Sequence, residues 1–136
     1  MMFAHLRALC LALLSQLVLI VGVAAQNTNV PASEVDVTLT SYAFAPSMIS
    51  LKANVPVRLH LVNNATKSHN FYAPEFFAAS TIAPADKSKV VDGGVDLDDG
   101  QTVDLTITPT RSGSYHLECT HFLHAMLGMT AQIKVQ

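Results

Sequence analysis

Hydrophobic and polar residues alternate one by one along several stretches of the chain, which is the pattern of strands with one buried and one solvent-facing side. Four runs show it clearly, and a shorter one closes the chain: residues 35–40, 57–62, 103–108, 115–120 and 133–135. Segments rich in Gly, Pro, Asn and Asp, which favour turns, separate these runs. They lie at residues 45–47, 63–64, 92–94, 98–100 and 112–113.

The spacing of these runs predicts one domain, with roughly seven short strands in about 110 residues, as is typical of an all-β Greek-key β-sandwich. The only helix that the sequence favours is a short one over residues 74–80, with Pro74 in its first turn. Residues 78–89 are expected to form an irregular, solvated crossing. His60 and His116 fall on the polar side of their strands, so we expect both to be solvated.

The beginning of the chain has the three-part pattern of a secretory signal. A weakly basic start at Arg7 precedes an apolar run from Leu9 to Val23, and small residues follow at Ala24-Ala25. A membrane anchor would need about 20 apolar residues, more than this run offers. We therefore predict a signal peptide at residues 1–25 and a single mature domain at residues 26–136, located in the periplasm and free of the membrane after cleavage.

The charge of the chain bears on its partners. The formal net charge is −2 at pH 7, and removal of Arg7 with the signal makes the remainder slightly more acidic. Nucleic-acid binding requires a basic surface, so we expect no nucleic-acid partner.

The cysteine count is more informative. Of the two cysteines, Cys10 leaves with the signal and Cys119 remains alone. Exported proteins usually pair their thiols in an oxidising compartment, so a single thiol indicates a metal ligand, a reactive nucleophile, an intermolecular bridge or simple burial.

Around Cys119 the sequence gathers the residue types that bind copper. The spacing Cys119-x4-His124-x4-Met129 stands in one segment, and His69 lies about fifty residues upstream. Thiolate and imidazole bind copper in both oxidation states, and a weak thioether ligand tunes the reduction potential. A thiol nucleophile would need a base and a group that stabilises an oxyanion. His121 or His124 could supply the base, but no Gly-rich elbow accompanies them, so we expect no enzymatic activity.

From roughly Val35 to Val135 the chain resembles the cupredoxins, the blue-copper family that includes plastocyanin, azurin and rusticyanin. The resemblance rests on Gly113-x-Tyr115-x3-Cys119 before the copper loop, on the rusticyanin-like length of that loop, and on the pair His69-Asn70. It implies one type 1 copper ion and a hydrogen bond between Asn70 and Thr120 that ties the two ligand segments together. The implied ligands are His69, Cys119 and His124 in the trigonal plane and Met129 in the axial position.

The copper loop also departs from the family. Phe122-Leu123 stands where many members have Pro-Gly, and the loop contains two spare ligand types, His121 and Met126. Met126 remains an alternative axial ligand, although Met129 has the more usual spacing. His121 is only two residues from Cys119, so we expect it not to join the same ion.

Two functions agree with one copper site. The first, which we favour, is a small monomeric electron carrier whose redox partners dock transiently near His124. The resemblance implies that apolar residues surround that histidine: Phe122, Leu123, Ala125 and Leu127. The second is periplasmic copper handling, in which His121 and the methionines serve a second or transferable ion, since thioethers favour Cu(I).

Overall fold

The computed structural model describes residues 33–136, so the predicted signal peptide and its cleavage site lie outside the described residues. Within residues 33–136, no helix is long and apolar enough to cross a membrane.

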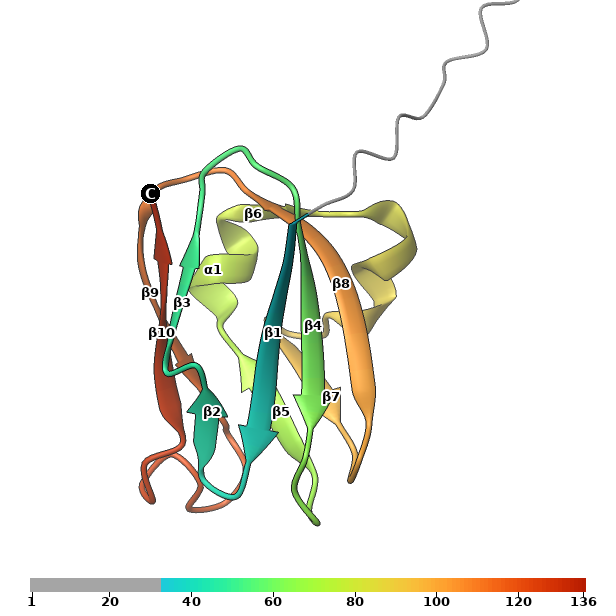
Figure 1. The fold of residues 1–136 in the computed structure, drawn as a ribbon, viewed down its shortest axis with the longest axis vertical. Helices are drawn as coiled ribbons and strands as arrows, with labels where there is room; N and C mark the ends of the chain where they lie inside the picture. The colour runs from blue at the N-terminus through green and yellow to red at the C-terminus, as the bar shows by residue number, and fades with distance from the viewer. Residues whose placement is uncertain (1–32) are drawn as a thin grey trace, which may run out of the picture.

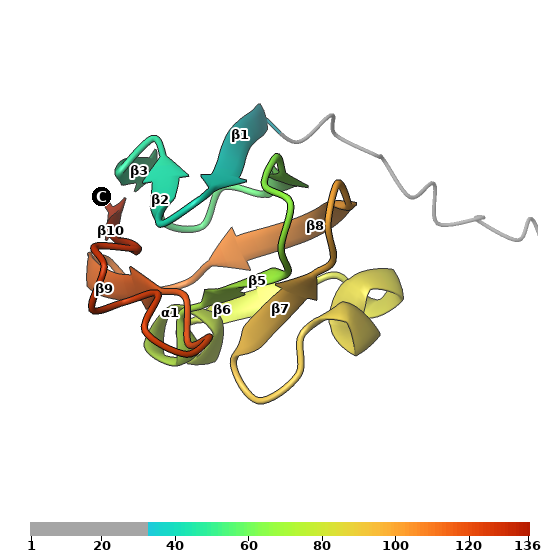
Figure 2. The ribbon, with the colours of Figure 1, turned by 90° about the horizontal axis from the view of Figure 1, so that it is seen from below.

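Residues 33–136 form ten strands in two five-stranded sheets that lie face to face (Figure 1, Figure 2). The first sheet has the order β2 (Ala43–Ala45), β1 (Ser33–Thr40), β4 (Val57–Asn63), β8 (Thr102–Pro109) and β6 (Ser80–Ile82). The second has the order β3 (Met48–Leu51), β10 (Thr130–Val135), β9 (Gly113–Glu118), β5 (His69–Tyr72) and β7 (Gly94–Leu97). The predicted all-β sandwich is confirmed.

The alternation in the sequence becomes the two faces of each sheet. Leu59 on β4 pairs with Leu105 on β8, and both side chains are fully buried between the sheets. Phe71 on β5 is also fully buried and packs edge-to-face against Phe44. Burying one such side chain contributes roughly 1.5–3 kcal/mol, so the regular inward positions explain why the sandwich is stable.

The predicted short helix is confirmed as α1 (Pro74–Ala78), which begins with proline and buries Phe76 and Phe77. The prediction of an irregular crossing at residues 78–89 was wrong, although residues 80–89 are exposed or half-buried, as expected of a solvated segment. This segment contains β6 and a 3₁₀ helix at Pro84–Lys89. Strand β6 has three residues, too few to show a period in the sequence, and it forms because Thr81 pairs with Thr108 on β8.

His116 is exposed on β9, as predicted, but the environment of His60 differs from the prediction. His60 is half-buried, and its Nδ1 lies 2.7 Å from a carboxylate oxygen of Asp104. This hydrogen bond raises the pKa of His60. Asp104 is on β8, directly opposite His60 in the sheet, and sequence patterns alone do not give that register.

The fold brings the ends of several strands together at one end of the sandwich, the lower end in Figure 1. Strand β5 begins there at His69, and β9 ends there just before Cys119. The loop of residues 119–129 then leads back into β10, and Figure 2 shows it at this end beside the turn between β1 and β2. The residues predicted to bind copper therefore meet at this end.

Candidate metal centre

Backbone hydrogen bonds shape the loop that carries three of the four predicted ligands. The Cys119 N–H donates to the carbonyl of Met129, at 3.1 Å, and the Met129 N–H donates to the carbonyl of His124, at 3.0 Å. Leu123 adopts a φ of 65° and Gly128 a φ of 99°. Leu123 thus has a left-handed backbone conformation, which costs a residue other than glycine about 1–2 kcal/mol. The loop closes so that its ligand positions become neighbours.

The donor atoms of three predicted ligands converge. The sulfur of Cys119 lies 3.7 Å from Nδ1 of His69 and 3.3 Å from Nδ1 of His124. The ligand atoms of these three residues all lie within 4.8 Å of one another. Metal bonds to sulfur and to imidazole nitrogen are about 2.0–2.3 Å long, so donors at these separations can share one ion.

Burial differs among the ligands. Cys119 is fully buried and His69 is 2% exposed, whereas His124 is half-buried. Burial lowers the pKa of His69, and the nearby imidazoles of His124 and His121 lower it further. The neutral imidazole is the form that binds a metal, so the site is electrostatically suited to one. Among the described residues, the buried Nε2 of His69 has no hydrogen-bond partner.

The two candidate axial methionines have opposite environments. Met129 is fully buried and hydrogen-bonded through its backbone to Cys119 and His124. Met126 is 83% exposed. An axial ligand must reach the buried sulfur and imidazoles, so burial favours Met129, and its assignment remains a prediction.

The link between the two ligand segments, implied by the resemblance, is present. The Asn70 side-chain amide donates to the hydroxyl of Thr120 at 2.7 Å, and the Thr120 N–H donates to the Asn70 carbonyl oxygen at 2.8 Å. Asn70 follows His69 and Thr120 follows Cys119, so these two bonds fix the strand β5 ligand against the loop. Such outer contacts orient ligands and hold their spacing.

Besides the His69 ring, whose centroid lies 4.7 Å away, two rings flank His124, and sequence reasoning missed one of them. The His121 ring is stacked against His124 with centroids 5.6 Å apart, and the edge of Tyr42 meets His124 at 5.3 Å. Tyr42 lies in the turn between β1 and β2, with a φ of 66°. Nothing in the spacing of Tyr42 relative to the ligands indicates this contact, because the turn belongs to the first sheet and the copper loop to the second, and the packing of the two sheets brings them together.

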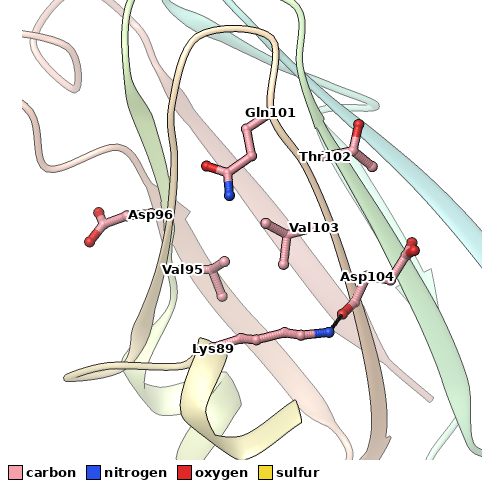
Figure 3. Close-up of a pocket in the computed structure, with 7 residues that line it drawn as sticks. All are labelled: Lys89, Val95, Asp96, Gln101, Thr102, Val103 and Asp104. Carbon is pink, nitrogen blue, oxygen red and sulfur yellow. Dashed lines mark hydrogen bonds between the residues drawn. The ribbon is translucent and has the colours of Figure 1, made fainter. Parts of the chain in front are cut away.

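A pocket elsewhere on the molecule has a different character. It has a volume of about 390 Å³ and lies between β7 and β8, where Lys89 crosses it and donates to the backbone oxygen of Asp104 at 2.8 Å (Figure 3). Lys89 also donates to Asp86 at 2.7 Å, so its charge is already paired. In Figure 3 the carboxylate of Asp96 points away from Lys89. The side chains therefore do not converge on a ligand, and the metal centre remains the candidate functional site.

Comparison with known proteins agrees with this geometry. The model of the cupredoxin-like domain family matches residues 10–131, and the chain belongs to this family. No curated protein sequence matches the chain.

Several solved structures share the fold. The reduced auracyanin of Roseiflexus castenholzii is 17% identical over 77% of this chain and 98% of its own, with a TM-score of 0.58. Auracyanin B is 26% identical over 78% of this chain and 90% of its own, with a TM-score of 0.55. A multicopper oxidase of Campylobacter jejuni is 12% identical over 81% of this chain but only 31% of its own, with a TM-score of 0.56.

Family and geometry together define the cofactor as one type 1 copper ion. A thiolate, two imidazoles and a thioether are the donors that this ion takes. The predicted donor set, His69, Cys119, His124 and Met129, has these types: the structure brings the donor atoms of the first three together and buries Met129.

Proposed function

We propose that the protein is a small electron carrier rather than an enzyme. When bound, copper supplies a one-electron couple between Cu(II) and Cu(I). The observation that carries the proposal is the convergence of the donor atoms of His69, Cys119 and His124 within 4.8 Å, braced by the two hydrogen bonds between Asn70 and Thr120. Ligands that are held in place need to move little when the charge at the site changes, and this favours rapid electron exchange.

The surface around His124 supports transient docking of a redox partner. His124 is half-buried, and large apolar side chains surround it in the loop. Phe122 is 86% exposed, Leu127 57% and Leu123 44%. Small interfaces of this kind suit weak complexes that form and separate quickly.

Similarity to the oxidase does not favour catalysis, because this chain corresponds to 31% of that protein's length. The described residues contain one group of metal-binding side chains, which suits a carrier of single electrons. A periplasmic location belongs to the proposal and depends on cleavage of the predicted signal peptide.

Copper handling is the second candidate, favoured by the His121 ring beside the site and by the exposed Met126.

One experiment separates the two functions. The copper-loaded protein is cycled between its oxidised and reduced forms in the presence of a Cu(I) chelator, and self-exchange is measured by NMR line broadening. A carrier retains its copper in both states and exchanges electrons rapidly. Loss of copper on reduction together with slow self-exchange would favour copper handling.

A further inference from the structure

The metal centre has one accessible side. Cys119 and Met129 are fully buried and His69 is 2% exposed, whereas His124 and His121 are half-buried. An ion that arrives from solvent therefore meets the two imidazoles of the loop before it meets the thiol. Within the described part of the chain, the side-chain hydrogen bonds at the metal centre join Cys119 to His69 and His124 and Asn70 to Thr120, and none of them involves the His121 ring.

The spacing of the two rings suits a shared ion. An ion about 2 Å from a ring nitrogen lies slightly more than 3 Å from the ring centre, so two ring centres up to roughly 6 Å apart can bind one ion. The centroids of His121 and His124 are 5.6 Å apart. Those of His121 and His69 are 6.4 Å apart, at the edge of this range, where the two metal bonds would have to be in line. His121 is therefore better placed to share an ion with the half-buried His124 than with the buried His69.

We propose that His121 and His124 form an entry site that captures Cu(II) at the surface and passes it to the buried ligands. The inference rests on the copper site of the proposed function and adds to it a role for His121, which lies outside the group of three converging donors. Imidazole is a good ligand for Cu(II), so two of them suffice for a transient complex.

The transfer is a ligand exchange in which no electron moves. His124 stays bound while the Cys119 sulfur replaces His121. The bond between His121 nitrogen and copper breaks, a bond between sulfur and copper forms, and the thiol proton is released to solvent. His69 then completes the buried set, and His121 returns to its stacked position against His124.

Copper uptake by the metal-free protein tests the proposal. Metal-free wild type and His121→Phe are mixed with copper(II) sulfate in a stopped-flow instrument, and growth of the thiolate-to-copper absorption band is recorded. Phenylalanine keeps a flat ring against His124 but has no ligand atom. We expect His121→Phe to take up copper at least about tenfold more slowly, the effect typical of losing a supporting group at a metal site, and to reach the wild-type final spectrum. His116→Phe, an exposed histidine on β9, is the matched control and should load at the wild-type rate.

Equal uptake rates for His121→Phe and wild type would overturn the entry site, and so would a final spectrum altered by His121→Phe, because His121 would then be a permanent ligand. If wild type itself never develops the band, the proposed function fails instead.

A second measurement needs no thiol. Cys119→Ser should still bind Cu(II) through imidazoles, and adding His121→Phe should weaken that binding about tenfold or more in calorimetry. Unchanged affinity in the double variant would also contradict the proposal.

Discussion

Met126 and Met129 lie three residues apart in the copper loop, yet Met129 is buried and Met126 is exposed. The sequence supplies both as axial candidates, since each has a thioether close to His124. Which one is buried depends on the turn at Gly128, where φ is 99°, and on the hydrogen bond that draws Met129 against Cys119. Spacing can rank the two methionines, but only the path of the backbone buries one and leaves the other 83% exposed.

Replacing Met129 should therefore change the redox properties, and replacing Met126 should not. Met129→Leu removes a weak donor to Cu(II), so the reduction potential should rise by about 60 mV or more, which is tenfold in a one-electron equilibrium, with the blue colour retained. Met126→Leu is the matched control and should leave the potential unchanged. Voltammetry measures both. A shift with Met126→Leu and none with Met129→Leu would reverse the axial assignment.

At the scale of elements, the sequence predicts long strands well and short ones poorly. Strands β4 and β8 show several alternations each, and the structure has both where they were expected. Strand β2 has three residues, and β7 four, so neither shows a period. Strand β5 begins with three consecutive buried residues, so alternation does not identify it either. His69 lies there as a residue type that binds copper, and the resemblance, through the pair His69-Asn70, assigns it as a ligand.

The copper loop shows a related limit. Its length and ligand order are visible in the sequence, as is the pairing of Asn70 with Thr120. The left-handed φ of Leu123 is not visible in the sequence, because leucine, unlike glycine, does not indicate such a conformation. The loop keeps this turn because the backbone hydrogen bonds within it, such as that between Met129 and His124, offset the local strain.

Asn70→Ala tests the link between the two ligand elements. The substitution removes two hydrogen bonds, each contributing about 0.5–1.5 kcal/mol, so it should cost about 1–3 kcal/mol. In the metal-free protein, amide hydrogen exchange of residues 120–129 should become faster while the strands remain protected, and copper should be lost more readily to a chelator. Asn64→Ala, an exposed asparagine on the neighbouring loop, should change neither. Fast exchange of residues 120–129 already in wild type would contradict a rigid site and favour copper handling.

At the scale of the whole molecule, the two sheets serve as a scaffold that presents one metal centre at one end. The core of the sandwich keeps Cys119 and His69 out of water, and the loop leaves His124 partly accessible among apolar side chains. Fold class follows from the sequence because alternation is a local pattern. The ligand set remains a prediction, drawn from the spacing of Cys119, His124 and Met129 and, for His69, from the resemblance. The pairing of His60 with Asp104 depends on sheet register, and the Tyr42 contact depends on how the two sheets pack; both link residues distant in the chain.

The visible absorption spectrum of the Cu(II)-loaded protein tests the central claim most directly. A thiolate of Cys119 bound directly to Cu(II) should give an intense charge-transfer band, and Cys119→Ser should abolish the band while circular dichroism shows an intact sandwich. The account predicts this band in wild type and its absence in the variant. A colourless wild-type protein, or a band that persists in Cys119→Ser, would contradict it.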